Sequence, residues 1–189
     1  MKRFTQLFTE LDSTTKGSAK QEALVSYFRE APEADAAWAV AILTGRRIRR
    51  VVSYTELRAL AAEQSGLPDW LVAECHSAVG DLSETIALIL PPPEHAEETT
   101  ISLSEMFEHR IRPMQRMDES ERSRLIIETW SMLGPEARFI FHKLLSGNFR
   151  VGVQKRTVVR ALANAFDLDA AVVSHRLSGR FEPTAESFL

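Results

Sequence analysis

The sequence predicts an all-α protein, and three observations lead to this prediction. Apolar residues recur at helical spacing along most of the chain, and the alternating apolar runs typical of strands are missing. Residues that cap helices precede many of the apolar segments. With 44% hydrophobic and 26% charged residues, the composition is that of a soluble globular protein, which excludes the disordered, collagen-like and coiled-coil classes.

The first half of the chain carries signals for six helices in order. The first has an apolar face within residues 4–11, and Ser18 is expected to cap the second, which ends before Pro32. A third helix is expected over 33–43, and it stops at Gly45, because glycine suits a left-handed helix end. Capping residues or a proline mark the starts of the next three helices: Ser53 with Glu56, Pro68, and Asp81 or Ser83.

A second series of helices follows a proline-rich, acidic connection at about 91–100. The run Pro91-Pro92-Pro93 stops the preceding helix, and Glu94 to Thr100 reads as a linker. Ser102 with Glu105 fits the capping box, in which two side chains satisfy each other's backbone amides, and therefore marks a new start. Helices are expected near 103–115, 120–133, 135–145, 154–166 and 170–177.

The second half of the chain repeats the first at an offset of 102 residues. Eight of the nineteen residues from Leu43 to Ala61 are identical to those 102 positions later, where composition alone gives about one or two. The repeat predicts two helical halves, about 1–93 and 101–180, related by pseudo-two-fold symmetry within a single domain that covers residues 1–189.

The net charge of −3 conceals an uneven distribution. Between Arg58 and Arg110 there are ten acidic residues and no lysine or arginine, so the remaining chain carries about +7. In both copies a Leu-(Thr/Ser)-Gly sequence precedes a basic loop and a new helix, an arrangement that suits phosphate oxygens. A solvated charged face is the alternative interpretation of such clusters.

One stretch resembles a family signature. Leu144 to Gln154, with the sequence LLSGNFRVGVQ, is followed by VVRALA at 158–163; together they resemble the signature of the amino-terminal DNA-binding domain of ATP-dependent DNA ligases. VGDL at 79–82 is similar to the family's Gly-Asp-Leu segment, although Ser83 stands where a second glycine is common. DSTTK at 12–16 resembles the loop between the first two helices, and FEPT at 181–184 resembles the lead into the catalytic core. The resemblance covers nearly the whole chain. The domain it resembles is that of the bacterial or archaeal type of ligase, which is related to the eukaryotic replicative ligase domain.

The resemblance implies a fold, a partner and a set of contacts. In the family this domain is a pseudo-symmetric helical bundle that lies along the minor groove of nicked duplex DNA and binds phosphates regardless of sequence. The whole ligase seals nicks in DNA repair, replication and recombination, and its implied cofactors are ATP and Mg. The DNA-binding residues implied by position are Gly147, Asn148, Arg150, Val151, Gly152, Val153, Gln154, Gly80, Asp81, Leu82, Thr15 and Lys16. Repeat symmetry adds Arg46, Arg47 and Arg49.

Catalytic and metal-binding patterns are missing from the sequence. No lysine is followed by Asp-Gly in the Lys-x-Asp-Gly pattern that takes AMP from ATP, so we expect no catalytic residue and no cofactor in this chain. The histidines are scattered and Cys75 is the only cysteine, so no metal site is expected. We expect an isolated domain without the nucleotidyltransferase and OB domains. Its expected partners are nicked duplex DNA and its own catalytic core.

The expected state is a cytoplasmic monomer, associated with the nucleoid if prokaryotic, without a signal peptide or a membrane span.

Two other functions remain open. Residues 157–166 and 170–177 resemble a helix-turn-helix of a transcription regulator, and the acidic middle suits a helical protein-interaction scaffold. Trp38, Trp70 and Trp130 are expected in the core rather than as base-stacking platforms.

Overall fold

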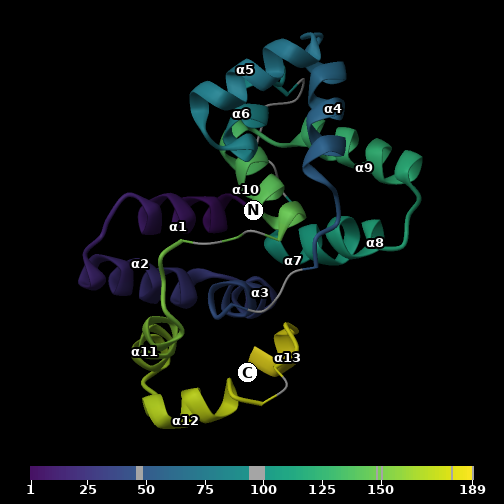
Figure 1. Ribbon diagram of the computed structural model, residues 1–189. Helices are drawn as coiled ribbons and strands as arrows, with labels where there is room; N and C mark the ends of the chain where they lie inside the picture. Colours follow the sequence, from purple (N-terminus) through teal and green to yellow (C-terminus); the bar gives the residue numbers. More distant parts are fainter. Residues whose placement is uncertain (46–48, 94–100, 148, 150, 180, 189) are drawn as a thin grey trace. The chain divides into compact units, whose positions relative to one another are not determined.

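The structure, a computed structural model, describes residues 1–45, 49–93, 101–147, 149, 151–179 and 181–188. Every regular element in these ranges is helical, which confirms the all-α prediction. The elements are α1 (Lys2–Asp12), α2 (Gly17–Glu30), α3 (Glu33–Leu43), α4 (Tyr54–Ser65), α5 (Asp69–Val79), α6 (Leu82–Ile89), α7 (Leu103–Glu105), the π-helix η1 (Met106–Ile111), α8 (Arg112–Met114), α9 (Glu119–Met132), α10 (Pro135–Ser146), α11 (Lys155–Phe166), α12 (Ala170–Arg176) and α13 (Ala185–Phe188) (Figure 1). None of the helices in the described ranges is long and apolar enough to cross a membrane.

Local capping accounts for several helix starts. The Ser53 side chain accepts a hydrogen bond from the Glu56 amide at 3.1 Å and so caps α4. Asp81 caps α6 in the same way, through the Glu84 amide at 3.1 Å. The expectation for Ser18 is wrong: α2 already begins at Gly17, and its N-cap residue contributes no side-chain hydrogen bond. The amino terminus of α2 therefore keeps backbone amides free of any side-chain cap.

The start of the helix at Leu103 is capped from a distant part of the sequence. The buried Asp35 carboxylate of α3 accepts hydrogen bonds from the Leu103 amide at 3.2 Å and the Ser104 amide at 2.8 Å. It also accepts one from the Ser104 hydroxyl at 2.8 Å. The predicted start is therefore correct, and a tertiary contact over 68 residues stabilises it.

The repeat extends over six helices. Adding 102 to the first residue of each helix from α1 to α6 gives a position within one residue of the starts of α7, α9, α10, α11, α12 and α13. For α2 this shift gives 119–132, which are the bounds of α9. Gly45 and Gly147, which correspond in the repeat, both have positive φ, at 85° and 70°. The repeat detected in the sequence is thus present in the secondary structure.

The chain divides into two compact units that interleave in sequence. Unit 1 comprises Met1–Arg47, Ser102–Ser104 and Arg150–Leu189, and unit 2 comprises Ile48–Ile101 and Glu105–Phe149. The predicted halves, 1–93 and 101–180, are therefore not the compact units. The physical reason is that the chain passes from unit 1 to unit 2 after α3 and from unit 2 to unit 1 after α10. The second part of each repeat therefore packs with the first part of the other repeat.

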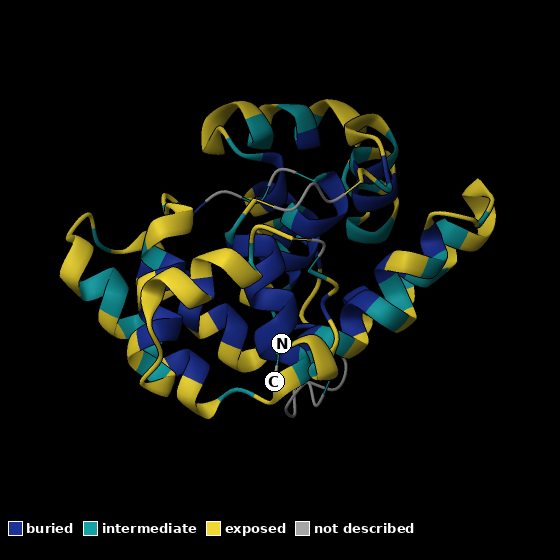
Figure 2. Cartoon of the chain, turned by 90° about the horizontal axis from the view of Figure 1, so that it is seen from below, coloured by how far each residue is buried: buried dark blue, intermediate teal, exposed yellow. Residues whose placement is uncertain are grey.

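Equivalent helix pairs build the two units. In unit 1, α2 packs on α11 and α3 packs on α13, so helices from the beginning and the end of the chain lie side by side (Figure 1). In unit 2, the repeats of α2 and α3, which are α9 and α10, pack on α4 and α6. Buried residues gather on the helix faces that pack together and exposed residues on the opposite faces (Figure 2). In unit 1, α3 is buried along nearly its whole length, from Asp35 to Leu43, as expected of a helix that is apolar on all sides.

Candidate nucleic-acid interface

The loop before α11 contains four described residues that are predicted DNA contacts. Val151 is buried, Val153 is half-buried, and Gly152 and Gln154 are exposed. Gly152 has a φ of 60°, which a residue with a side chain rarely adopts, so glycine is needed for this turn. Gln154 is the N-cap residue of α11 and makes no side-chain capping bond. The backbone and polar atoms of this loop are therefore better placed for binding than the Val151 side chain.

Lys20 of α2 forms hydrogen bonds with the backbone of this loop. The Lys20 ammonium donates hydrogen bonds to the carbonyl oxygens of Val151 at 3.0 Å and Gly152 at 3.2 Å. A Cβ atom added to Gly152 would lie 3.2 Å from the Lys20 Nζ, so the two residues are in close contact. In the sequence, the only signal for Lys20 is that it lies one helical turn after Lys16.

The amino termini of α2 and α11 lie at the same end of this helix pair. Lys20, in the first turns of α2, contacts the residues just before α11. At the other end of α2, Arg29 donates to the carbonyl oxygens of Asn164 at 3.2 Å and Ala165 at 3.4 Å, in the last turn of α11. Unit 1 therefore brings the predicted Thr15–Lys16 loop and the predicted 151–154 loop to one end of two helices.

This end of unit 1 suits an anion. Thr15 and Lys16 are exposed, and Lys16 is the N-cap residue of α2. Neither α2 nor α11 has a side-chain cap, so both present free backbone amides and the positive end of the helix dipole. Phosphate oxygens are the ligands that such helix ends bind best.

Several cations of unit 1 have carbonyl oxygens as partners, whereas several of those in unit 2 have carboxylates. In unit 1, Lys20, Arg29 and Lys155 donate to carbonyl oxygens, the last to Leu177 at 3.1 Å, and Arg3 pairs with the Glu30 carboxylate of α2 at 2.8 Å. Among the described residues of unit 2, five cations form ion pairs: Arg58–Asp69, Arg110–Glu128, Arg112–Glu108, Arg122–Glu56 and Lys143–Asp81. A carbonyl oxygen carries no net charge, so these bonds do not neutralise Lys20, Arg29 and Lys155.

The net charge follows the same division. Unit 1 contains 13 basic and 10 acidic residues, and unit 2 contains 10 basic and 16 acidic residues. Unit 1 thus carries +3 and unit 2 carries −6. Of the two units, unit 1 therefore has the net charge that suits a phosphate backbone.

The Gly80–Asp81–Leu82 segment lies in unit 2, where it joins α5 to α6. Gly80 is exposed and ends α5 with a φ of 84°, and Leu82 is buried. Burial alone would raise the pKa of Asp81, but hydrogen bonds from Lys143 and from the Glu84 amide outweigh it, so this pKa lies below its ordinary value. The Asp81 carboxylate therefore acts in capping and pairing, and a DNA contact of this segment would use the main chain.

A buried polar network supports the start of α6. His142 of α10 is fully buried, and its Nδ1–H donates to the Ser83 carbonyl oxygen at 3.1 Å. Its Nε2 accepts a hydrogen bond from Trp130 Nε1 at 2.7 Å, so both ring nitrogens are used by the neutral form. Burial is the main cause that lowers the pKa of His142 to about 4. The network joins α6, α9 and α10 through one imidazole ring.

The other predicted contacts lie at the loops between the repeated helices. Gly147 is half-buried and ends α10, and Arg49 is exposed in unit 2. Arg46, Arg47, Asn148 and Arg150 lie outside the described residues, so their roles stay predictions. Among the residues that are described, no group of three or more His, Cys, Asp or Glu side chains could hold a metal ion.

A comparison with protein families decides the assignment. The family model described as DNA ligase N terminus matches residues 1–163. The chain belongs to this family, that of the amino-terminal domain of ATP-dependent DNA ligases. No curated protein matches the chain.

Two of the three tryptophans of this ligase domain are in its core. Trp38 and Trp130 are buried, as predicted, but the prediction for Trp70 is wrong because 66% of its surface is exposed. Apolar residues occur on several sides of α5, and only Val72 is buried there, so spacing could not show which side faces the core.

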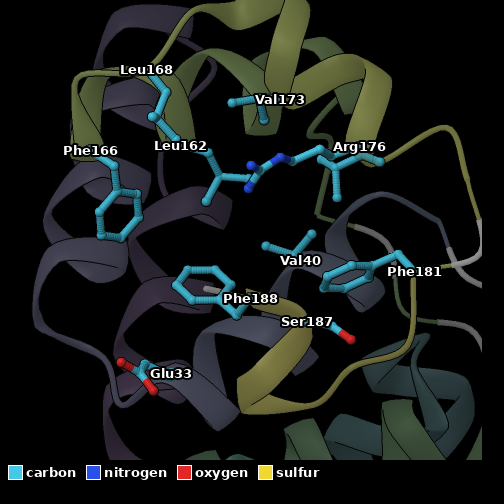
Figure 3. Close-up of a pocket in the computed structure, with 11 residues that line it drawn as sticks. Glu33, Val40, Leu162, Phe166, Leu168, Val173, Arg176, Phe181, Ser187 and Phe188 are labelled. Atoms are coloured by element: carbon cyan, nitrogen blue, oxygen red, sulfur yellow. The ribbon is translucent and has the colours of Figure 1, made fainter.

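The ligase domain also contains an apolar pocket of about 330 Å³ in unit 1. It lies among α3, α11, α12 and the segment from Phe181 to Phe188, and the Arg176 side chain extends across it (Figure 3). Most of the lining is apolar, including Phe166 and Phe188, whose ring centroids are 5.7 Å apart. Thr15, Lys16 and residues 151–154 are not among the described residues that line it, so this pocket is separate from the candidate interface.

Proposed function

We propose that this domain binds duplex DNA through its phosphate backbone, without sequence preference and with a preference for nicked duplex. It would hold DNA for the catalytic core of an ATP-dependent ligase that acts in repair or replication. The observation that carries the proposal is the end of unit 1 where the uncapped amino termini of α2 and α11 lie beside Lys20 and Lys155, which have no carboxylate partner among the described residues.

The electrostatics of unit 1 support phosphate binding. Exposed Lys16 stands at the α2 amino terminus, and Lys155 and Arg156 begin α11, so positive side chains add to the helix dipoles. Backbone amides and lysines contact phosphates in the same way whatever the base sequence. Binding of this kind releases counterions, and its affinity falls steeply as salt increases.

The domain supplies binding rather than the nucleotidyl transfer step. The sequence has no Lys-x-Asp-Gly motif, so ATP and Mg would act in the catalytic core. What this domain contributes is a higher local concentration of DNA at that core.

Fluorescence anisotropy with a labelled duplex tests the proposal. We expect similar affinity for two unrelated sequences, tighter binding to a nicked duplex than to an intact one, and weaker binding as salt is raised. Lys16→Glu should weaken binding strongly, whereas Arg124→Glu, the same charge change on an exposed residue of unit 2, should have a smaller effect. No binding to any duplex at low salt would contradict the proposal.

The helix-turn-helix alternative has one supporting observation. α11 and α12 pack together and are joined by the three-residue segment 167–169. However, α12 is only seven residues long, and its polar side chains suited to base reading are His175 and Arg176, at its end. Strong preference for one sequence over a scrambled duplex would favour this alternative.

A further inference from the structure

The carbonyl groups of two successive residues point toward one ammonium group. The oxygens of Val151 and Gly152 both accept hydrogen bonds from Lys20. A trans peptide group is planar, and its N–H points opposite to its C=O. Turning these two carbonyls toward Lys20 therefore turns the amides of Gly152 and Val153 away from it.

The two amides have no acceptor among the described residues. Gly152 is in the left-handed region, with a φ of 60°, and successive amides around such a residue form a concave anion site called a nest. The uncapped amino terminus of α11 follows after Gln154 and adds further free amides in the same chain direction. In the conformation that includes the Lys20 bonds, the loop thus offers these donors to an anion.

We propose that Lys20 is a positioning residue of the DNA interface. It binds the carbonyls of the 151–152 turn, and the amides of Gly152 and Val153 are thereby presented to a phosphate. Lys20 acts through the turn and does not itself contact the phosphate. This inference rests on the proposed DNA-binding function.

The repeat shows that this arrangement is specific to unit 1. Arg122 of α9 occupies the position 102 residues after Lys20. Arg122 pairs with the Glu56 carboxylate at 2.9 Å and donates to the Met117 carbonyl oxygen at 3.2 Å. At corresponding positions, unit 2 therefore neutralises its cation with a carboxylate, and unit 1 uses its cation to orient a turn without neutralising it. Phosphate binding should accordingly depend on the loop of unit 1 more than on its counterpart.

The test compares Lys20→Met, Lys20→Arg and the matched control Arg29→Met in the whole chain. Arg29 lies on the same helix and also donates to two carbonyl oxygens of the α11 region, but at the far end of the helix pair. Affinity for nicked duplex is measured over a range of salt concentrations, and NMR follows the amide signals of Gly152 and Val153. Thermal unfolding shows that each variant is folded.

We expect Lys20→Met to weaken DNA binding about tenfold at every salt concentration, with a nearly unchanged salt slope. The Gly152 and Val153 signals should shift, Lys20→Arg should bind within about threefold of wild type, and Arg29→Met should leave these signals in place. Combining Lys20→Met with Gly152→Ala should weaken binding little more than either change alone, because both disturb the same turn.

The opposite results would overturn the inference. A salt slope that falls by about 0.9 in Lys20→Met would mean that Lys20 contacts phosphate directly, and the inference would be overturned. Unchanged amide signals, or additive losses in the double variant, would also overturn it. If wild type binds DNA and Lys20→Met binds equally well, the inference fails alone, whereas no binding by wild type means that the proposed function fails.

Discussion

Replacing His142 by glutamine is expected to remove most of the acid sensitivity of this domain between pH 6.5 and pH 4. In the folded state the ring is buried, and its Nε2 faces the Trp130 N–H at 2.7 Å, so an added proton there would place two donors against each other. The pKa of His142 is lowered from 6.5 to about 4, with burial as the main cause. In the unfolded chain the imidazole takes up its proton near the ordinary value.

The sign and size of the effect follow from this difference. Above pH 6.5 neither state is protonated, and the neutral ring contributes its full stabilisation. As the pH falls below 6.5, protons bind the unfolded state and lower the free energy of unfolding, until the folded state also becomes protonated near pH 4. At about 1.4 kcal/mol per pKa unit, the loss over this window is about 3 kcal/mol, or about 6–12 °C in Tm for a domain of this size.

Urea unfolding at a series of pH values between 7 and 4 measures the effect. Wild type should lose about 3 kcal/mol, whereas His142→Gln should be less stable at pH 7 and nearly independent of pH in this window. His175→Gln, on an exposed position of α12, is the matched control and should keep the wild-type slope. Asp81, whose pKa lies below its ordinary value of 3.8, loses its contribution only at lower pH. Parallel losses in wild type and His142→Gln would refute the reasoning.

Two further predictions concern stability. Asp35→Ala removes three hydrogen bonds to Leu103 and Ser104 and should lower the free energy of unfolding by about 2–4 kcal/mol in a urea titration; a change below about 0.5 kcal/mol would contradict the capping role. Trp70→Ser should change the free energy of unfolding by less than about 0.5 kcal/mol, because the side chain is mostly exposed. A loss above about 1 kcal/mol in the same titration would mean that Trp70 is packed in the core.

Helix starts were predictable where the signal lies within one turn. Ser53 accepts from the Glu56 amide, as their spacing favours, and Asp81, one of the two predicted starts, caps α6, because such bonds depend only on neighbouring residues. Ser18 shows the limit of this reasoning, since a capping residue inside the first turn competes with an earlier start. The π-helix η1 within the segment expected as one helix had no recognised local signal.

The candidate site was predictable only in part. The signature around Gly147 to Gln154 identified the loop before α11, and Gly152 does require the positive φ that only glycine adopts easily. The role of Lys20 could not be predicted, because the bonds to Val151 and Gly152 join residues more than 130 positions apart. A lysine four residues after another lysine looks the same in the sequence whether it faces solvent or orients a loop.

The sequence by itself determined the all-α class, the family and the repeat, because apolar spacing, capping and motif identity are properties of neighbouring residues. Only the tertiary structure decided that α11 to α13 pack with α2 and α3 while α4 to α6 pack with α9 and α10. Apolar spacing shows which face of a helix is buried, but it does not show on which copy of the repeat that face packs. That packing places a charge of +3 in one unit and −6 in the other, within a chain of net charge −3.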